Sequence, residues 1–517
     1  MKRKLLAVIM SCAVLAGVMP TGVFAADGTA VSEEAAAAIE ERKESGEIPT
    51  LVVAFMNWSG SPKGLERVEE KMSEYTEETL GVRVKLEIMD SASYGQEMTL
   101  MLASGEQVDV FNTVYVGYTS SVNKGYCLDF EEDDLIQTYG AGILDTFPED
   151  LIDACRVDGI LYGAPQQRDM CVGLRGFVIG AEYLDGIGFD YASMYEDGEE
   201  FIYTDMDTIE DIFAQLHEKY PDKTVYGPQA NDLMDIFYDN VGLDNYGVLT
   251  DPENSLELES LWTSDAFREH CELMHKWNQA GYISKDALTD DTIPSAQVKA
   301  GTTMAYMSIT KPGSAVAEKG VCGRDVVIFQ TGENLMRSSS VSKYPWSINS
   351  MTEEPVAAMQ LLNALYTDPV LSNLICWGEE GVDYVYTEDG HITFPEGVNA
   401  DNSEYYNGTN WLLPNQFIAN IWEGDSFDVW ERTEAFNNSG IRSKALGFTF
   451  DNSSVANEYT ALTNVFNEYV YQLTYGFVDP AEGIPELEEK MEAAGQSVYM
   501  QAKQEALDAW AETAGIE

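Results

Sequence analysis

Strand-length apolar segments alternate with amphipathic helical segments along the first part of this chain, with only short turns between them. Residues 50–55 form an apolar run of strand length, and residues 82–88 alternate strictly between apolar and charged side chains. Segments 65–79 and 94–102 have helical periodicity, and 108–111 is the next strand. Since short connections between strands and helices favour parallel strands, this order predicts an α/β domain.

The middle of the chain repeats this alternation, with an apolar segment at 174–179 and a helix at 208–220. We therefore expect a second α/β lobe. The last part of the chain is mostly helical. Its expected helices span 356–366, 369–377, 458–475 and 486–514. A chain of 517 residues, of which 45% are apolar, is long enough to bury several cores.

The charge balance excludes whole classes of partner. The chain carries 88 Asp and Glu against 30 Lys and Arg, which is a formal net charge of −58. Such a charge repels a phosphate backbone, so we expect no nucleic-acid binding. The four histidines include no pair at helical metal spacing and there is no Cys-x-x-Cys, so we expect no metal site and no cofactor. We expect the acidic runs at 129–134 and 196–200 to lie on the solvated surface, and calcium binding by these runs is an open alternative.

The N-terminus has the three regions of a secretory signal. Three basic residues at 2–4 precede an apolar stretch at 5–18 and a small-residue segment that ends at Ala25-Ala26. We expect a signal peptide over 1–25, cleavage near Ala25, and an exported protein that is extracellular or associated with the cell surface. Residues 26–49 are rich in Ala, Glu and Ser and predict a flexible acidic tether that could adopt helical structure.

Two covalent features stay open at this point. Cleavage before Cys12 would allow lipidation, but it would leave an apolar stretch shorter than a signal needs, so free secretion is favoured. The mature chain keeps six cysteines, which allow 15 disulfide pairings or remain buried free thiols. No bridge is assigned. These cysteines are Cys127, Cys155, Cys171, Cys271, Cys322 and Cys376.

Five short segments, in this order, carry a resemblance to a known family. They are 102–110 (LASGEQVDV), 157–165 (VDGILYGAP), 346–349 (WSIN), 373–384 (NLICWGEEGVDY) and Trp411 with Asn415-Gln416-Phe417. Together they resemble the extracellular solute-binding proteins, family 1-like, of ATP-driven (ABC) sugar importers, in the branch with a C-terminal domain of unknown function. One departure is that Leu413-Pro414 stand where the family usually has a glycine.

The resemblance implies a two-lobed fold of the periplasmic-binding-protein-like type II class, with an interlobe cleft that closes on its ligand and extra C-terminal helices. By family order, lobe one spans 50–165 plus 302–340, and lobe two spans 166–301 plus 341–517. The return crossing between the lobes is expected at 298–306. The implied function is to capture a carbohydrate, expected to be an oligosaccharide, and to deliver it to a membrane permease. We expect a monomer.

Aromatic residues near the ends of the predicted strands are the first ligand candidates. A sugar needs flat aromatic faces for its C–H patches and fixed polar groups for its hydroxyls. Trp58 follows the first strand, and Tyr115 and Tyr118 follow the strand at 108–111. In parallel sheets the carboxyl ends of the strands present the ligand. We therefore expect these three side chains at the cleft.

The crossing segments supply the other candidates. Arg168 and Asp169 directly follow the first crossing hairpin, and their alternative role is a surface ion pair. Trp346 opens the last crossing segment and belongs either to the hinge or to the cleft. Trp411 and Asn415 occupy the fifth resembling segment. We expect all five to contact ligand.

The sequence contains none of the catalytic motifs that we searched for. Adjacent carboxylates such as Glu379-Glu380 and Asp133-Asp134 are expected by chance among 88 acidic residues. The sequence has no nucleophile elbow and no phosphate-binding loop. We therefore expect a binding protein without enzymatic activity. A secreted carbohydrate-active enzyme of the glycoside hydrolase kind, on an unrelated fold, is the alternative.

Overall fold

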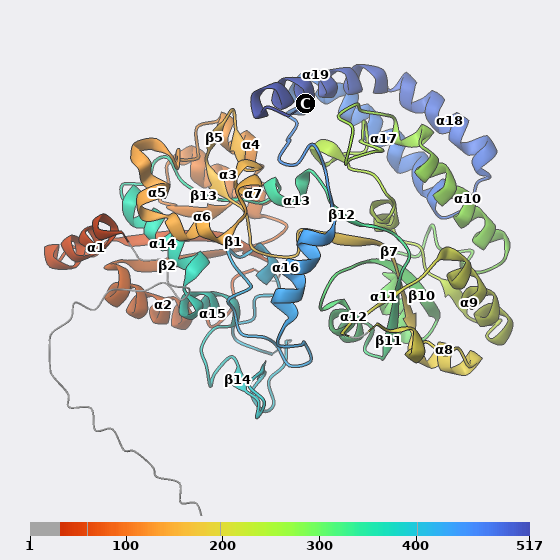
Figure 1. Cartoon of the computed structure of the whole chain (residues 1–517), viewed down its shortest axis with the longest axis horizontal. Helices are drawn as coiled ribbons and strands as arrows, with labels where there is room; N and C mark the ends of the chain where they lie inside the picture. Colours follow the sequence, from red (N-terminus) through yellow and green to blue (C-terminus); the bar gives the residue numbers. More distant parts are fainter. Residues whose placement is uncertain (1–31, 59, 197, 401, 517) are drawn as a thin grey trace, which may run out of the picture.

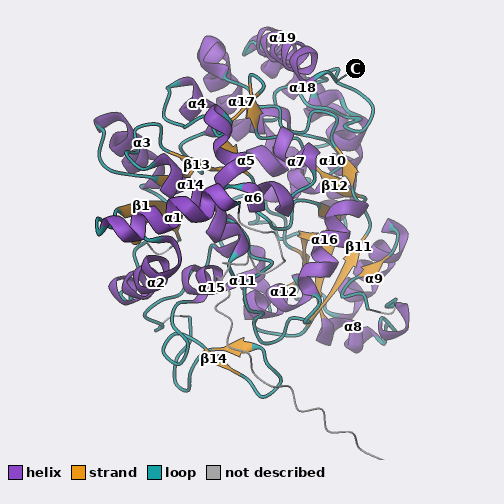
Figure 2. Ribbon diagram, turned by 60° about the vertical axis from the view of Figure 1, so that its left-hand side comes forward, coloured by secondary structure: helices purple, strands orange, loops and turns teal. Residues whose placement is uncertain are grey.

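Two lobes, each with its own β-sheet, make up the computed structural model of this chain (Figure 1). The structure describes residues 32–58, 60–196, 198–400 and 402–516. The expected signal peptide and its cleavage near Ala25 lie outside the described residues. Helices cover the strands of both lobes (Figure 2). This arrangement confirms the predicted two-lobed α/β class.

Lobe one is built on a five-stranded sheet in the order β2-β1-β3-β13-β6. Strand β1 pairs in parallel with β2 and β3, as the alternation of the sequence predicted, and β13 joins antiparallel. The strands are β1 (Thr50–Asn57), β2 (Arg83–Asp90), β3 (Val110–Asn112), β6 (Gly163–Ala164) and β13 (Trp346–Ile348). Its helices are α2 (Leu65–Leu80), α3 (Tyr94–Ser104), α4 (Tyr118–Asn123), α5 (Leu135–Tyr139), α6 (Ala141–Thr146), α7 (Glu149–Asp153), α14 (Pro355–Thr367) and α15 (Pro369–Trp377).

Lobe two has a seven-stranded sheet in which β7 is central. Strand β7 pairs antiparallel with β10, β11 and β12. The strands are β7 (Val172–Gly180), β8 (Ile202–Tyr203), β9 (Thr224–Tyr226), β10 (Thr303–Thr310), β11 (Val326–Gln330), β12 (Asn334–Met336) and β16 (Ile441–Arg442). Its helices are α8 (Ala181–Ile187), α9 (Met206–Lys219), α10 (Asp265–Gln279), α11 (Pro294–Ala300) and α12 (Ser314–Cys322). Short hairpins β4 (Arg156–Val157) with β5 (Ile160–Leu161) and β14 (Val385–Tyr386) with β15 (Ile392–Thr393) lie outside both sheets.

The assignment of residues 302–340 to lobe one is wrong, and so is the assignment of the part of 341–517 that holds β13, α14 and α15 to lobe two. Strand β10 pairs with β7 and β9 in the second sheet, and β11 and β12 follow it there. The chain returns to lobe one only at β13, and α14 and α15 then pack on that lobe. The return crossing is therefore at 337–345 rather than 298–306. The apolar pattern of a fully buried strand is the same in either sheet, so it carries no information about which sheet the strand joins.

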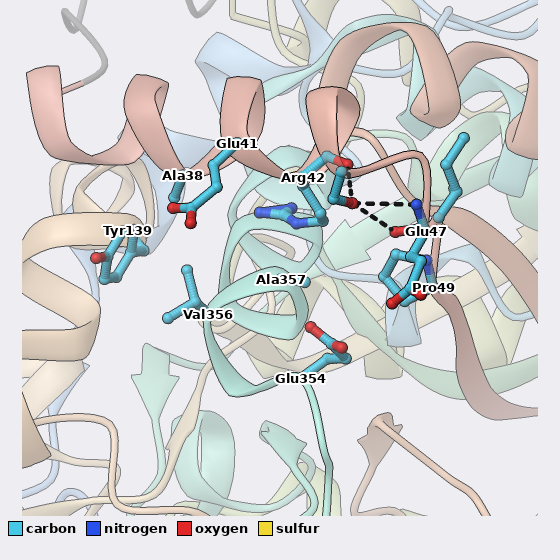
Figure 3. A pocket seen from close by; sticks show the side chains of 11 residues that line it. Ala38, Glu41, Arg42, Glu47, Pro49, Tyr139, Glu354, Val356 and Ala357 are labelled. Atoms are coloured by element: carbon cyan, nitrogen blue, oxygen red, sulfur yellow. Dashed lines mark hydrogen bonds between the residues drawn. The ribbon is translucent and has the colours of Figure 1, made fainter.

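Residues 33–45 are a docked helix rather than a flexible tether. Helix α1 (Glu33–Ser45) begins at Ser32, whose side chain accepts a hydrogen bond from the Ala35 N–H, and it buries Ala35 and Ile39. The Arg42 guanidinium donates to the Leu80 carbonyl at 2.9 Å and to the Gln360 side chain. Figure 3 shows Arg42 between α1 and α14, above a shallow hollow. Two buried side chains and one arginine thus hold this alanine- and glutamate-rich helix against lobe one.

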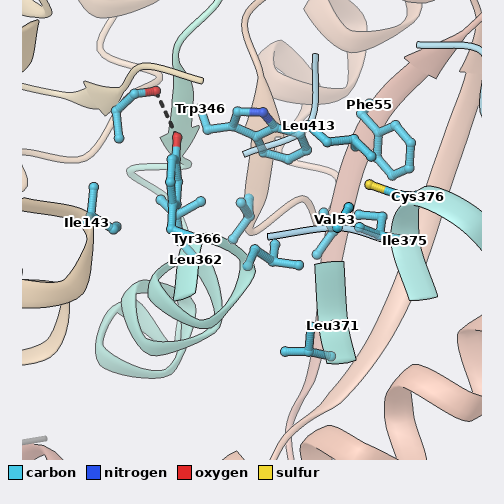
Figure 4. Close-up of a cluster of buried hydrophobic side chains, with 14 of the residues drawn as sticks. Val53, Phe55, Ile143, Trp346, Leu362, Tyr366, Leu371, Ile375, Cys376 and Leu413 are labelled. Atoms are coloured by element: carbon cyan, nitrogen blue, oxygen red, sulfur yellow. Dashed lines mark hydrogen bonds between the residues drawn. The ribbon is translucent and has the colours of Figure 1, made fainter. Parts of the chain in front are cut away.

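The core of lobe one lies between its sheet and helices α14 and α15 (Figure 4). Trp346 is fully buried there, with its ring centroid 6.0 Å from that of Phe55. The Tyr366 hydroxyl donates to the Pro165 carbonyl at 2.6 Å, which ties α14 to the first crossing segment. The six cysteines of the described chain are buried and unpaired.

Three long helices form a C-terminal layer on lobe two, at the upper right of Figure 1. They are α17 (Ala456–Thr474), α18 (Pro480–Ala493) and α19 (Gln496–Ala514); α17 and α18 pack on α10, and α19 packs on α17 and α18. The Lys503 ammonium of α19 is fully buried and forms an ion pair with Asp244 at 2.9 Å. None of the described helices combines the length and the apolarity that a membrane span requires.

Candidate ligand-binding cleft

Three crossing segments connect the lobes and are hydrogen-bonded to one another. They are residues 165–171, residues 337–345 with α13 (Ser339–Ser342), and residues 413–440 with α16 (Val429–Ser439), and both helices lie between the lobes in Figure 1. The Gln167 N–H donates to the Pro414 carbonyl at 2.9 Å, and the Arg168 guanidinium donates to the Ser340 carbonyl at 3.1 Å. These contacts join the three crossing segments into one connected surface between the lobes, which we call the floor. A hinge motion of the lobes would bend the chain at these segments.

A hollow of about 280 Å³ lies at one end of this floor. One wall is the loop from Tyr406 to Trp411, which packs on lobe one, and the other is Lys311 to Ala317 of lobe two, with α16 between them. A second hollow of about 310 Å³ lies between the start of α4 in lobe one and the segment from Phe448 to Asn452 that precedes the C-terminal helices. Both hollows therefore have walls from both lobes.

A row of side chains in contact with one another runs along the floor from one hollow to the other. Trp411 lines the first hollow and its ring centroid lies 5.8 Å from that of Tyr344. Lys343 lines the second hollow and its Nζ lies 4.8 Å from the Tyr344 centroid. The Arg168 guanidinium lies 5.9 Å from the Trp411 centroid. The two hollows therefore share one floor, and we call the floor and the two hollows together the cleft.

The loop at 405–412 lies across the carboxyl ends of the first sheet. The Asn57 amide donates to the Tyr406 carbonyl at 3.2 Å, and the Thr409 hydroxyl donates to the Met56 carbonyl at 3.0 Å. This brings Trp58, which is 51% exposed, beside Gly408, where an added Cβ would lie 3.7 Å from the indole. Tyr406 is 38% exposed. An aromatic surface therefore borders the first hollow, where parallel strands are expected to present a ligand.

Four side chains that line the first hollow carry buried polar atoms with no hydrogen-bond partner among the described residues. These atoms are Asn407 Nδ2, Asn410 Oδ1, Asp169 Oδ1 and Trp430 Nε1. A buried polar atom without a hydrogen-bond partner costs roughly 1–3 kcal/mol of stability, so such atoms are normally hydrogen-bonded to solvent or to a ligand. The set contains both donors and acceptors, as the hydroxyl groups of a sugar require.

The same hollow holds a charged pair. The Lys311 ammonium lies 2.6 Å from Asp169 Oδ2. Although burial opposes ionisation, the positive charges of Lys311 and Arg168 lower the pKa of Asp169 below its ordinary value. Burial, with the nearby charge of Glu200, raises the pKa of Asp425 to about 6. Near neutral pH both carboxylates are therefore charged and can accept hydrogen bonds.

Four of the predicted ligand residues lie at the first hollow or in the floor beside it. Trp411 and Asp169 line the first hollow, Trp58 borders it, and Arg168 lies in the floor. The alternative of a surface ion pair between Arg168 and Asp169 does not hold, because Asp169 is buried and pairs with Lys311, and Arg168 donates to the Asp169 backbone carbonyl at 2.9 Å.

The other four predicted residues are placed differently. Trp346 is fully buried in the core of lobe one and its indole N–H donates to the Leu412 carbonyl at 2.7 Å, so it lies neither in the cleft nor in the crossing segment 337–345. The Asn415 amide is buried and donates to the Tyr366 carbonyl at 2.8 Å. Tyr118 lines the second hollow, but its hydroxyl is buried and donates to the Cys155 carbonyl at 2.6 Å. Tyr115 is 56% exposed and follows β3, outside both hollows.

The prediction missed several residues that line the cleft. They are Lys311, Lys343, Tyr406, Asn407, Asn410 and Trp430. The loop around 405–411 has the sequence YYNGTNW, and such a run of aromatic and amide side chains was a usable signal for sugar binding. Lys343 and Trp430 have no such signal, because only the meeting of distant segments brings them to the cleft. Among the described residues, no group of three or more His, Cys, Asp or Glu side chains is arranged to hold a metal ion.

Known proteins resemble this chain over most of its length. Residues 71–375 match the family described as bacterial extracellular solute-binding protein, and residues 444–512 match a domain of unknown function. A carbohydrate ABC transporter substrate-binding protein of Streptococcus pneumoniae serotype 4 is 23% identical over 460 residues, which cover 87% of this chain and 89% of that protein.

Solved structures show the same fold. The N-glycan transport solute binding protein of Streptococcus pneumoniae has a TM-score of 0.75 at 22% identity, covering 90% of this chain and 99% of that chain. An extracellular solute-binding protein from Bifidobacterium longum subsp. infantis has a TM-score of 0.62 at 16% identity, with the same coverage of both chains.

Proposed function

This chain belongs to the bacterial extracellular solute-binding protein family, and we propose that it captures a carbohydrate between its lobes and delivers it to the membrane permease of an ABC importer. The observation that carries the proposal is the first hollow, where unpartnered polar atoms of four side chains lie beside exposed or half-buried aromatic rings. Sugars need this combination, because each ring has both C–H faces and hydroxyl groups.

The proposed ligand is an oligosaccharide. Two hollows at the ends of one floor give room for more than one ring, with Trp411 and Tyr344 between them. The relatives support this proposal by their descriptions, one as a carbohydrate transporter component and another as an N-glycan transport protein. Within the cleft, Trp58, Trp411, Asp169 and Arg168 are the proposed contacts, together with Asn407 and Asn410.

The ligand is proposed to leave the cleft unchanged, because the protein binds and does not catalyse. Glu379, one of the adjacent carboxylates that could suggest acid–base chemistry, accepts a hydrogen bond from Arg67 at 3.0 Å and so serves the packing of α2. We further propose export by the N-terminal signal with cleavage near Ala25, function as a monomer outside the cytoplasm, and no nucleic-acid partner.

A thermal-shift screen of the mature protein against mono- and oligosaccharides tests the proposal. A ligand present at 100 times its dissociation constant should stabilise the fold by about 2.7 kcal/mol. Each hit is then incubated and analysed by chromatography for products. Binding without turnover supports the proposal, turnover supports the enzyme alternative, and no stabilisation by any sugar contradicts carbohydrate capture. Asn407→Asp removes the unpartnered Nδ2 donor and keeps the oxygen that accepts hydrogen bonds from the Thr409 N–H and hydroxyl, and it should weaken every hit.

A further inference from the structure

The cleft floor carries two positive side chains that have no carboxylate partner. The Arg168 guanidinium donates only to backbone carbonyls, those of Asp169 and Ser340, and its Nε is buried without a partner. The Lys343 ammonium contacts the face of Tyr344 and makes no hydrogen bond or ion pair with any described residue. The chain has 88 acidic and only 30 basic residues, so most basic side chains are expected to find a carboxylate partner. Two cations without such a partner at the cleft therefore indicate a functional role.

These two cations are close enough to repel one another. Burial, together with the positive charge of Arg168, lowers the pKa of Lys343 to about 8. The lysine is therefore still mostly charged at neutral pH, in a place that disfavours its charge. The faces of Trp411 and Tyr344 compensate only in part, because a cation–π contact is weaker than a paired charge.

Two acidic side chains that line the hollows, Asp169 and Asp451, already have partners. Asp169 forms an ion pair with Lys311 in the first hollow. Asp451 lines the second hollow beside Lys343, and its side chain caps residues 452–455 by accepting a hydrogen bond from the Ser453 N–H. Neither carboxylate forms a hydrogen bond or an ion pair with Arg168 or Lys343, and Arg168 acts on the Asp169 carboxylate only through the field of its charge. An incoming anion would find two positive groups and would relieve their repulsion.

We propose that Arg168 and Lys343 together bind an anionic substituent of the carbohydrate, either a carboxylate or a sulfate ester. The inference rests on the proposed function and deepens it, since it assigns an acidic rather than a neutral ligand to the same cleft. Arg168 supplies a planar donor group that matches such oxyanions, and Lys343 supplies a point charge from the adjacent segment. Lys343 lines the second hollow, and Arg168 lies in the floor beside Trp411, which lines the first hollow.

Calorimetry with matched ligand pairs tests this inference at constant ionic strength. One arm compares free with methyl-esterified oligogalacturonides, and the other compares sulfated with unsulfated galactose oligosaccharides. In at least one arm the acidic form should bind roughly ten- to hundredfold more tightly, as expected for a charge-assisted hydrogen bond. The arm that shows the difference identifies the anion as carboxylate or sulfate.

Lys343→Gln should remove most of this advantage, whereas Lys343→Arg should retain it. Lys343→Gln breaks no hydrogen bond within the protein, so the melting temperature without ligand should stay close to that of the wild type. Lys285→Gln is the matched control, because Lys285 is exposed and lines neither hollow. It should leave both members of each pair unchanged.

The possible outcomes separate this inference from the proposed function. Equal affinity for neutral and acidic forms, or an acidic preference that survives in Lys343→Gln, overturns the anion site and leaves carbohydrate capture standing. Failure of all sugars to bind, neutral and acidic, overturns both. A preference for the acidic form that disappears in Lys343→Gln and returns in Lys343→Arg supports both.

Discussion

Replacing Trp58 with alanine should weaken ligand binding strongly and leave the fold nearly unchanged. The indole is 51% exposed in the structure without ligand. For a tryptophan side chain of ~250 Å², this leaves ~130 Å² that a sugar ring can cover. If the ligand covers half to all of it, removal costs about 1.5–3 kcal/mol at ~25 cal/mol per Å². That corresponds to an affinity loss of roughly 10- to 150-fold.

Titration calorimetry with the best sugar from the screen measures this loss. Trp58→Phe should keep part of the aromatic face and fall between wild type and Trp58→Ala. The free energy of unfolding without ligand should change by less than about 0.5–1 kcal/mol, because half of the side chain is already in solvent. An affinity for Trp58→Ala within threefold of wild type would refute the reasoning and remove Trp58 from the binding surface.

Four further predictions address the core of lobe one, the C-terminal layer, the closure of the lobes and the charge of the cleft. Trp346→Phe should lower stability by about 1–3 kcal/mol, because it removes the 2.7 Å hydrogen bond to the Leu412 carbonyl and leaves only the Asn112 amide at 3.5 Å as a donor. It should change affinity less than threefold, as chemical denaturation and calorimetry would show. Lys503→Ala should lower stability by about 3–5 kcal/mol, since it leaves the buried Asp244 carboxylate without its cation, whereas Lys490→Ala, on the exposed side of α18, should have little effect in the same denaturation assay. Small-angle scattering should show a smaller radius of gyration at saturating ligand, and an unchanged profile would argue for a cleft that is already closed. Affinity for an acidic sugar should fall as the pH rises above about 8, because Lys343 with its pKa of about 8 then loses its charge, while affinity for a neutral sugar should stay constant between pH 7 and 9.5 in calorimetry.

The local sequence pattern predicted several of the elements that form the lobe-one side of the cleft. The alternation at 50–111 predicted the parallel strands β1, β2 and β3, and the position of Trp58 after β1 predicted a side chain at the carboxyl edge of the sheet. These features follow from neighbours in the sequence, since strand periodicity and the exit of the chain from a strand are local properties.

Exposure was less predictable than position. Trp346 and Asn415 lie in segments that resemble the family, yet both side chains are buried and donate to backbone carbonyls. In the sequence, a tryptophan that contacts a ligand cannot be told from a tryptophan that is buried in a core. Only the packing of α14 and of the loop around Leu412 determines which of the two applies.

The sequence alone determined the α/β class, the two-lobed architecture implied by the family resemblance, and the excess of negative charge. The tertiary structure decided which sheet β10, β11 and β12 join, and it decided that Arg168, Lys343, Tyr344 and Trp411 meet on one floor. The physical reason is that the periodicity of a segment depends only on which of its own faces points to the core and which to solvent. Which distant segment supplies the partner depends on the packing of the whole chain, and the charge balance of a cleft depends on those partners.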